Sequence, residues 1–409
     1  MFQKFKNKYH LLRSIFSNIY YGFPSQNLII IGVTGTDGKT TTVNIIYHIL
    51  KTAKLNPSMV SSVGAAIGGE QYDLELHRTT PAAWGIQKFI KMAKDVNSNY
   101  LILEVTSHAL DQYRTWGINF KIGVITNITR EHLDYHKNYE NYVRVKFKLL
   151  KSAKIGIYNK DDQSRDLIEN LINNIKERKK WITYGIKSKA MVTPESFKYS
   201  SNIPGEFNNY NILAAIATCK ELGINNQDIR KGIASFSLPI GRVESIYKKD
   251  FEVIIDFAHT PNSIDQVLKS VRQKTKGRLI HVFGSAGKRD YAKRPIMGSM
   301  ASKYADVIVL TAEDPRGESI DKISDGIASG FTKEFQKQEV DEFVNKKDKA
   351  FVKINNRKKA IEFAIAIAGK GDLVIITGKS HEKSINYGNK EEAWDEFKIA
   401  REAIKIRKK

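Results

Sequence analysis

Short apolar runs alternate with stretches of helical periodicity along most of the chain. The first series of β-branched runs lies at 28–34, 59–63, 100–106 and 122–128. A second series lies at 252–257, 279–283, 306–311, 351–354 and 372–377. Continuous apolar strands separated by helices are typical of a parallel sheet that is covered on both faces. The pattern therefore predicts two α/β units, each built on a mostly parallel sheet.

Two weaker apolar runs, at 154–159 and 181–185, flank a polar helical stretch and are expected at an edge of the first sheet. A polar segment near residue 240 separates the two series. We therefore expect three parts along the chain. These are an N-terminal arm at 1–27, a central domain at 28–240 and a C-terminal domain at 241–409.

The arm has a basic character and helical periodicity. Its apolar residues recur at the spacing of one helical face, and they are Leu12, Ile15, Phe16, Ile19 and Tyr20. This spacing predicts a helix that packs through its apolar face against the central domain. Attachment to a membrane surface is the alternative, because the polar face of the helix is basic. Polar residues interrupt the apolar core that a secretory signal would need.

The charge balance favours acidic partners. The chain has 66 Lys plus Arg against 44 Asp plus Glu, a formal net charge of +22, which suits nucleotide phosphates, nucleic acid or anionic lipid. The basic residues are spread along the whole chain and no nucleic-acid-binding motif is visible, so nucleic acid is not expected as a partner. No apolar run reaches the ~18 residues of a membrane span. With a single cysteine, the sequence fits a cytoplasmic protein without an integral membrane segment.

The strongest chemical motif is GVTGTDGKTTT at 32–42, between the first apolar strand and a helical stretch. Glycines let backbone N–H groups close around phosphate oxygens, and the helix N-terminus adds positive potential. Lys39 supplies a charge for the terminal phosphates, and Thr40 is placed to bind Mg²⁺. Val33 stands where a strict Walker A motif has glycine. The expected nucleotide contacts are Gly35, Thr36, Asp37, Gly38, Lys39, Thr40 and Thr41.

Two further candidates follow the next buried strands. Glu104 lies at the end of the strand at 100–106, and His132 lies in the segment TNITREHLDYH after the strand at 122–128. Ligands of open α/β sheets bind at the carboxyl ends of the strands, and a carboxylate beside a nucleotide needs a cation such as Mg²⁺. Either residue alone would be an ordinary polar loop group. Together, downstream of a phosphate loop, they predict a metal–nucleotide site.

Lys146 falls on the apolar face of a predicted helix. Its stripe is shared by Tyr139, Tyr142, Val143, Phe147 and Leu150. An inward lysine either packs its stem, pairs with a buried carboxylate such as Glu104 or Asp134, or is catalytic or chemically altered.

The strand ends of the second series carry charged loops. They are DFAHTPNS at 256–263, GSAGKRD at 284–290, EDPR at 313–316 and GKSHE at 378–382. None has the pattern GxGxxG, so a nicotinamide cofactor is not expected. Charged loops at successive strand ends predict a site for a polar, zwitterionic substrate. Within DFAHTPNS, Thr260 is the expected N-cap of a helix and Pro261 its first residue.

The ordered set of motifs resembles the Mur ligase family, most of all the members that add the third amino acid of the peptidoglycan stem peptide. The motifs are GTDGKTTT, HRTTP, EVTSHAL, TNITREHLDYH, PGEFNNYN, GRVE, DFAHTP, EDPR and GKSHE. This resemblance implies a P-loop ATPase domain followed by a Rossmann-like domain. It also implies a monomeric ATP-dependent ligase that forms C–N bonds in peptidoglycan synthesis.

The resemblance further implies roles for individual residues. Lys39, Glu104, His132 and Lys146 would be catalytic. Two Mg²⁺ ions would be held by Thr40, Glu104, His132 and Lys146, with Lys146 carbamylated by CO₂. ATP would also contact Asn211, Arg242 and Asp256, and the acceptor would contact Thr79, Thr80 and Ser107. The amino-acid side of the site would comprise His259, Glu313, Asp314, Arg316, Gly378 and Glu382.

The implied reaction joins a free amino acid to a UDP-MurNAc-dipeptide-like acceptor through an acyl phosphate. Three departures from the family are visible. Only about 27 residues precede the nucleotide loop, where the family normally has a domain that binds the UDP-sugar. Asp-Asn-Pro-Arg is replaced by EDPR, and Ser380 replaces a glycine. Arg316 and Glu382 fit a diamino acid with a distal carboxylate, whereas Asp314 would suit the plain ammonium of lysine.

Two other functions are consistent with the sequence. One is a ligase like folylpolyglutamate synthetase, although GTDGKTTT and HRTTP match the cell-wall branch better. The other is a nucleotide-binding scaffold or partner subunit without its own acceptor site.

Overall fold

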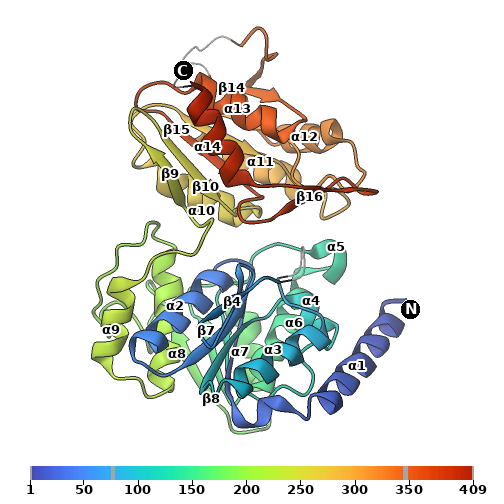
Figure 1. Ribbon diagram of the computed structural model, residues 1–409, viewed down its shortest axis with the longest axis vertical. Coiled ribbons are helices and arrows are strands. Elements are labelled where there is room, and N and C mark those ends of the chain that lie inside the picture. The colour runs from blue at the N-terminus through green and yellow to red at the C-terminus, as the bar shows by residue number, and fades with distance from the viewer. Residues whose placement is uncertain (1, 75–78, 344–348, 408–409) are drawn as a thin grey trace. The chain divides into compact units, whose positions relative to one another are not determined.

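The structure is a computed structural model, and it describes residues 2–74, 79–343 and 349–407 (Figure 1). The described chain groups into two units. The first comprises Met1–Thr129 and Tyr135–Pro239, and the second comprises Arg130–Asp134 and Ile240–Lys409.

The first unit is built on an eight-stranded sheet with the order β4-β3-β2-β5-β1-β6-β7-β8. The strands are β1 (Ile29–Thr34), β2 (Pro57–Ser61), β3 (Gly64–Ile67), β4 (Glu70–Tyr72), β5 (Tyr100–Glu104), β6 (Phe120–Ile125), β7 (Ile155–Asn159) and β8 (Lys180–Tyr184). From β2 to β8 neighbouring strands are parallel, while β3 and β4 form an antiparallel extension. Because β5 and β6 flank β1, their carboxyl ends lie beside the loop that follows β1.

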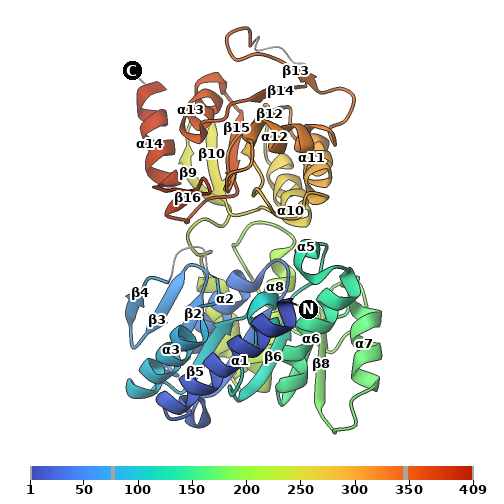
Figure 2. The same ribbon diagram turned by 90° about the vertical axis from the view of Figure 1, so that its right-hand side faces the viewer.

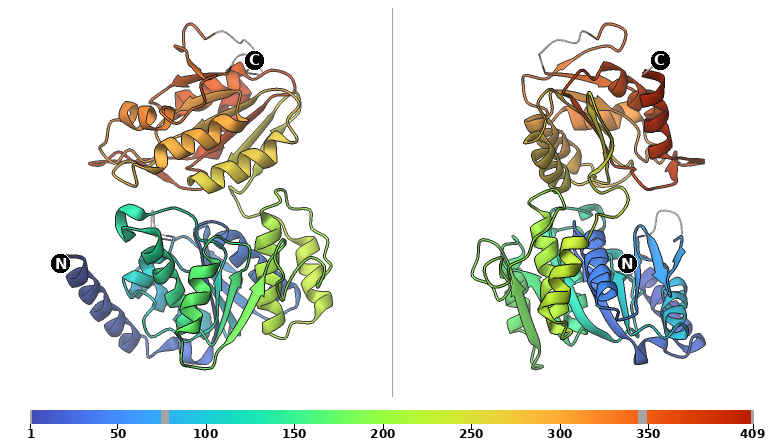
Figure 3. Two further views of the ribbon diagram at one scale, coloured as in Figure 1. Left: turned by 180° about the vertical axis from the view of Figure 1, so that it is seen from behind. Right: turned by 60° about the vertical axis from the view of Figure 1, so that its left-hand side comes forward.

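Helices cover both faces of this sheet (Figure 3). The helices in this part of the chain are α1 (Phe2–Tyr20), the 3-10 helix η1 (Pro24–Asn27), α2 (Lys39–Thr52), α3 (Ala83–Asp95), α4 (Ser107–Asp111), α5 (Leu133–His136), α6 (Tyr139–Ser152), α7 (Arg165–Asn173), α8 (Asn208–Glu221) and α9 (Asn226–Ser235). The first two residues of α5 group with the second unit. Successive residues of β1 enter opposite cores: Ile31 packs with α2, α8 and α9, and Ile30 packs with α3. This alternation explains why the strand is apolar throughout.

The second unit has a seven-stranded sheet with the order β13-β14-β12-β11-β15-β10-β9, in which only β9 is antiparallel to its neighbour. The strands are β9 (Glu244–Lys248), β10 (Glu252–Asp256), β11 (Leu279–Phe283), β12 (Val307–Leu310), β13 (Gln336–Lys337), β14 (Ala350–Lys353) and β15 (Leu373–Thr377). A separate hairpin contains β16 (Ser384–Asn386) and β17 (Glu391–Ala393). The predicted α/β class, with mostly parallel sheets, is confirmed.

The helices of the second unit are α10 (Pro261–Arg272), α11 (Lys293–Tyr304), α12 (Ile320–Ala328), α13 (Arg357–Ile367) and α14 (Glu396–Arg407). At the start of α10 the Thr260 side chain accepts a hydrogen bond of 3.1 Å from the Ser263 backbone N–H, and Pro261 is the first helical residue. The predicted cap is confirmed. It fixes the direction in which the chain leaves β10.

The arm is helical as expected, but the predicted packing face of α1 was wrong. Ser14, Ser17 and Asn18 are fully buried, whereas Leu12 and Phe16 are 53% and 61% exposed. Figure 1 shows α1, in dark blue, on the outside of the first unit. Periodicity gives the apolar face of a helix, but it does not say which face meets the protein.

Candidate active site

The loop between β1 and α2 needs glycine at two positions. Gly38 has a φ of 78°, and a Cβ there would lie 2.2 Å from the Oδ1 atom of Asn211. A Cβ on Gly35 would lie 1.8 Å from the Oγ1 atom of Thr126. Both contacts are far too short for real atoms, so the tight curve of the loop depends on bare backbone. Such a curve directs N–H groups toward a phosphate at the start of α2.

Residues at the end of β6 hold this loop in shape. The Asn127 side chain accepts a hydrogen bond of 2.9 Å from the Asp37 N–H, and its backbone carbonyl accepts one of 2.8 Å from the Thr36 N–H. The Thr126 hydroxyl donates to the Asp37 carbonyl at 2.7 Å. Thr126 and Asn127 begin the motif TNITREHLDYH, in which only His132 was assigned a role. They directly follow β6, the strand next to β1, and this position is the signal that a topology-based prediction would have used.

Thr40 and Glu104, both predicted metal ligands, lie together. The Thr40 hydroxyl donates to the Glu104 carboxylate at 3.0 Å, and the Ser62 backbone N–H donates to the same oxygen at 2.8 Å. Glu104 is 1% exposed. A hydroxyl and a carboxylate are oxygen ligands of the kind that Mg²⁺ binds, so this part of the site fits the ion. Ser62 was missed because it lies in a turn with no motif of its own.

Lys146 is buried, as its position in α6 predicts, with 1% of its area exposed. Its Nζ atom donates a hydrogen bond of 2.6 Å to the Gly35 carbonyl and lies 4.6 Å from the centroid of the Tyr142 ring. The side chain therefore reaches the phosphate loop rather than solvent. Lys39 is also directed at the loop, because its Nζ atom donates to the Thr36 carbonyl at 2.7 Å.

Asn211 brings α8 to the same loop. It is 4% exposed, and the Thr42 hydroxyl donates to its Oδ1 atom at 3.4 Å. Thr41, another of the predicted nucleotide contacts, is 5% exposed and lies at the start of α2. The first unit thus assembles the loop, Asn211, Glu104 and Lys146 in one place.

His132 is not assembled with these residues within the first unit. It lies in Arg130–Asp134, the segment that groups with the second unit. Its φ of 56° is left-handed, and its Nδ1 atom lies 3.9 Å from the Glu131 carboxylate. In the part of the chain that the structure describes, no group of three or more His, Cys, Asp or Glu side chains could hold a metal ion.

The residues predicted to face the acceptor surround the end of β5. The Thr80 hydroxyl donates to the Glu104 carbonyl at 3.0 Å and accepts from the Thr106 N–H at 2.9 Å. Thr79 precedes it and is half-buried. His77 and Arg78, the start of the HRTTP motif, lie outside the described residues. Thr80 therefore supports the strand that carries Glu104.

Ser107 has a histidine partner that its motif does not reveal. Its hydroxyl lies 3.0 Å from the Nε2 atom of His136. His136 is 5% exposed, and burial lowers its pKa to about 4. The imidazole is therefore neutral near pH 7 and serves as a hydrogen-bonding partner of Ser107.

In the second unit, Asp256 and Arg242 stabilise the turn around β9 and β10. The Asp256 carboxylate accepts hydrogen bonds of 2.7 Å from the Val243 and Ala258 N–H groups. Burial raises the pKa of Asp256, and the charge of Arg242 opposes that rise. The Arg242 guanidinium lies 4.7 Å from the centroid of the Phe257 ring. This cation–π contact holds the guanidinium against the ring.

An ion pair connects the EDPR and GKSHE loops. Asp314 accepts from the Lys379 ammonium at 2.9 Å and from the Arg316 guanidinium at 3.3 Å. Lys379 is fully buried and also binds Glu382. Arg316 has a left-handed φ of 53°. The carboxylate of Asp314 is thus already paired with two cations.

Glu313, the first residue of EDPR, is buried beside Gly378. Burial raises the pKa of Glu313, which is 8% exposed. Its Oε2 atom has no hydrogen-bond partner among the residues that the structure describes. A Cβ on Gly378 would lie 3.0 Å from that oxygen, so glycine permits the close approach.

His259 lies on the neighbouring loop, where its carbonyl accepts from the Lys293 ammonium at 3.2 Å. Lys293 was missed because it is the first residue of α11 and belongs to no motif.

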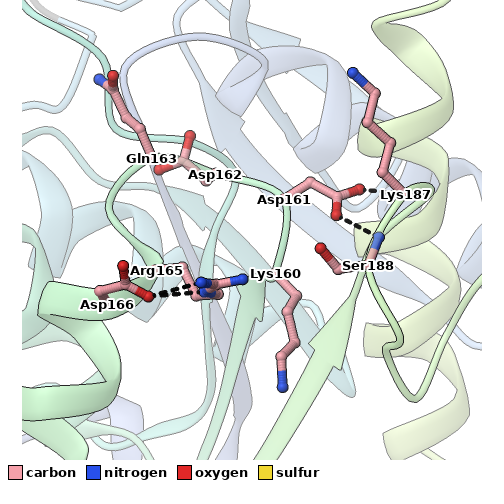
Figure 4. A pocket seen from close by; sticks show the side chains of 8 residues that line it. All are labelled: Lys160, Asp161, Asp162, Gln163, Arg165, Asp166, Lys187 and Ser188. Carbon is pink, nitrogen blue, oxygen red and sulfur yellow. Dashed lines mark hydrogen bonds and ion pairs between the residues drawn. The ribbon is translucent and has the colours of Figure 1, made fainter.

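A polar pocket lies at the end of β7 (Figure 4). It is lined by Lys160, Asp161, Asp162, Gln163, Arg165, Asp166, Lys187 and Ser188. The Asp161 carboxylate accepts from the N–H groups of Ile186, Lys187 and Ser188 at 2.6–2.8 Å. Burial opposes the effect of these bonds on the pKa of Asp161, but they lower it to about 2. The pocket contains no residue of the predicted site, and Asp161 serves to tie two loops together.

Comparison with protein families matches two parts of the chain. Residues 33–219 match the Mur ligase middle domain, and residues 241–380 match the Mur ligase glutamate ligase domain. UDP-N-acetylmuramoyl-L-alanyl-D-glutamate--2,6-diaminopimelate ligase 1 of Clostridium acetobutylicum is 36% identical over 407 residues, which cover 94% of this chain and 80% of the relative. The chain belongs to the Mur ligase family. It is therefore an ATP-dependent ligase that forms amide bonds.

Solved structures agree with this assignment of the fold. A UDP-N-acetylmuramoyl-L-alanyl-D-glutamate--2,6-diaminopimelate ligase has a TM-score of 0.60 and 28% identity, covering 94% of this chain and 80% of that chain. The folylpolyglutamate synthase of Mycobacterium tuberculosis has a TM-score of 0.69 and 16% identity, covering 91% and 93%. This second likeness is one of fold alone. Within the described residues, none of the helices combines the length and apolarity needed to cross a bilayer.

Proposed function

We propose that this Mur ligase joins a diamino acid to a UDP-MurNAc-dipeptide, driven by ATP, in cytoplasmic peptidoglycan synthesis. The names of relatives that are 33–36% identical over most of this chain support the acceptor and the amino acid. The observation that carries the proposal is the arrangement around the phosphate loop, where Thr40 contacts Glu104 and Lys146 reaches Gly35. We propose that the enzyme acts as a monomer.

In this proposal the chain binds ATP through the loop from Gly35 to Thr41 and through Asn211 at that loop, and Arg242 and Asp256 are further proposed ATP contacts. Thr40, Glu104, His132 and Lys146 would hold two Mg²⁺ ions, which would supply positive charge against the phosphates. We propose that Lys146 takes part as a carbamate, formed when its neutral amine attacks the carbon of CO₂ and the nitrogen then loses a proton to water. Carbamylation converts a buried cation into an anion, and this gives a functional reason for a lysine on the apolar face of α6.

The proposed chemistry has two displacements. A carboxylate oxygen of the acceptor attacks the γ-phosphorus of ATP, giving an acyl phosphate and ADP. The amino group of the incoming amino acid then attacks the acyl carbon, the C–O bond to phosphate breaks, and the amine loses a proton. Lys39 contributes charge near the phosphates, and the chain forms no covalent intermediate. Positioning and charge neutralisation are expected to supply most of the rate.

The charged loops of the second unit support a diamino acid with a distal carboxylate. Asp314 is paired with Lys379 and Arg316, so it is poorly placed to bind the ammonium of lysine. The Nε atom of Arg316 is buried without a hydrogen-bond partner among the described residues, which leaves a donor for a substrate carboxylate. We therefore propose 2,6-diaminopimelate as the amino acid.

The test is a panel of amino acids supplied with UDP-MurNAc-L-Ala-D-Glu and ATP, with product mass and released phosphate both measured. We expect a product with 2,6-diaminopimelate, weaker or no product with L-lysine, and phosphate release only when acceptor and amino acid are both present. Product with L-lysine but not with 2,6-diaminopimelate would contradict the choice of 2,6-diaminopimelate and identify L-lysine as the amino acid. ATP binding with no product from any amino acid would favour a nucleotide-binding scaffold instead.

A further inference from the structure

The N-terminal helix α1 turns its apolar face to solvent. Its large apolar side chains are 53–72% exposed, and they are Tyr9, Leu12, Phe16, Ile19 and Tyr20. At about 100° per residue they form one continuous stripe along the helix. Single exposed apolar residues are common on proteins, but a stripe of five on one helix is a surface that calls for a partner.

The opposite face of α1 is polar and fixes the helix to the first unit. Asn18 donates to the Trp116 carbonyl at 2.9 Å, and Asn7 donates to the Asp111 carboxylate at 3.0 Å. Asn18 packs so closely on Gly117 that a Cβ there would lie 2.7 Å from its Oδ1 atom. These buried polar contacts set the rotation of the helix. The apolar stripe therefore cannot turn inward without leaving them unsatisfied.

Basic residues flank the stripe on both sides. With the stripe centred between Leu12 and Phe16, helical geometry places Lys8 on one side and Lys6 and Arg13 on the other. All three basic side chains are exposed. The sequence of α1 has no Asp or Glu, and the chain as a whole has a net charge of +22. Figure 2 shows α1 running across the outside of the first unit, next to α3.

We propose that α1 is a peripheral membrane-binding helix that lies in the interface of an anionic lipid bilayer. The apolar stripe would enter the boundary between headgroups and acyl chains, and the flanking cations would meet lipid phosphates. We choose an anionic bilayer as the partner because the basic side chains beside the stripe are complementary in charge to lipid phosphates. An apolar protein partner would need no cations beside the stripe, whereas in-plane helices use basic residues there, as Lys6, Lys8 and Arg13 are placed here. This inference concerns where the enzyme works and is independent of the proposed substrates.

The experiment is flotation of the full chain with vesicles of 30% phosphatidylglycerol in phosphatidylcholine, and with vesicles of phosphatidylcholine alone. We expect binding to the anionic vesicles at low salt, and at least about tenfold weaker binding to the neutral ones, because each cation near the surface contributes about 1 kcal/mol. At 0.5 M salt the difference should shrink. No binding to anionic vesicles, or equal binding to both kinds, would overturn the proposal.

Variants locate the surface. Leu12→Ser/Phe16→Ser/Ile19→Ser and, separately, Lys6→Gln/Lys8→Gln/Arg13→Gln should each weaken vesicle binding about tenfold or more. The matched control is Met191→Ser/Ile406→Ser, which removes apolar side chains that are 57% and 67% exposed elsewhere, and it should bind as the parent does. Phe16→Ser alone is a milder variant in case the triple variant unfolds, and it should weaken binding in the same direction.

Two outcomes would contradict this location. If the apolar variants bind anionic vesicles as well as the parent, α1 is not the membrane surface. If sedimentation shows a dimer that the apolar triple variant dissociates, a second copy covers the stripe instead of lipid.

Discussion

The Nζ atom of Lys146 donates a hydrogen bond of 2.6 Å to the backbone carbonyl of Gly35. This bond joins α6 to the loop between β1 and α2. Lys146 is nearly fully buried, so the contact is made in an environment where charge is costly. A carbamate at this position would be an anion at the phosphate loop, where the proposed metal ions would offset its charge.

Replacing Lys146 by alanine is expected to abolish ligation, with a loss of at least about a thousandfold in phosphate release. The variant would remove a ligand of the metal ion that offsets the charge developing on the phosphate. Added formate or acetate should restore part of the activity by supplying a carboxylate. Lys151→Ala, on the exposed side of the same helix, is the control and should keep normal activity. Full activity of the Lys146 variant without added carboxylate would refute the carbamate.

Replacing Gly38 by alanine should weaken ATP binding by at least about tenfold, because the new Cβ would overlap the Asn211 side chain. Gly223→Ala is a matched control. Gly223 has a similar φ of 77° but nothing within 4 Å of its Cβ position, so this variant carries only the backbone strain. ATP affinity can be measured by calorimetry. Equal losses in the two variants would mean that strain, and not the contact with Asn211, is responsible.

Glu104→Gln should raise the Mg²⁺ concentration needed for half-maximal phosphate release by at least about tenfold. The amide keeps an oxygen for the Ser62 N–H but carries no charge for the ion. Glu140→Gln on α6 is the control, since Glu140 is 54% exposed and pairs with Arg144 at the surface. An unchanged Mg²⁺ dependence in the Glu104 variant would remove this residue from the metal site.

The lowered pKa of His136 should make the free energy of unfolding depend on pH. Burial holds its pKa at about 4 in the folded chain, below the ordinary 6.5, so the unfolded chain binds a proton first as the pH falls. The stabilisation is complete above about pH 6.5 and is lost as the pH falls toward 4. Urea midpoints at several pH values should therefore decline over this window. His136→Gln should flatten that part of the decline, and an identical decline in the variant would contradict the assignment.

Much of the fold could be predicted because local patterns and packing agree. The central strands of both sheets have apolar runs, and the inward position of Lys146 follows from its spacing with Tyr142 and Val143. The short strands β3 and β4 were not predicted, since β4 is three residues long and largely exposed. The face of α1 was misjudged because its docking relies on hydrogen bonds of Asn7 and Asn18, which periodicity does not register.

The site was predictable in part for a similar reason. Thr40 and Glu104 belong to motifs, and the parallel pairing of β1 with β5 brings them together. Ser62 and Lys293 contribute contacts but belong to no motif, so only the tertiary structure reveals them. The positions of His132 and of Arg242 relative to the phosphate loop stay predictions.

Transfer of oxygen from the acceptor tests the central claim most directly. The enzyme is supplied with ATP, diaminopimelate and a UDP-MurNAc-dipeptide whose reacting carboxylate carries ¹⁸O at both oxygens, and the released phosphate is analysed by mass. Attack of that carboxylate on the γ-phosphorus, followed by displacement by the amine, predicts one ¹⁸O atom in each phosphate and one amide bond per phosphate. Unlabelled phosphate, or phosphate released without amide product, would contradict ligation through an acyl phosphate.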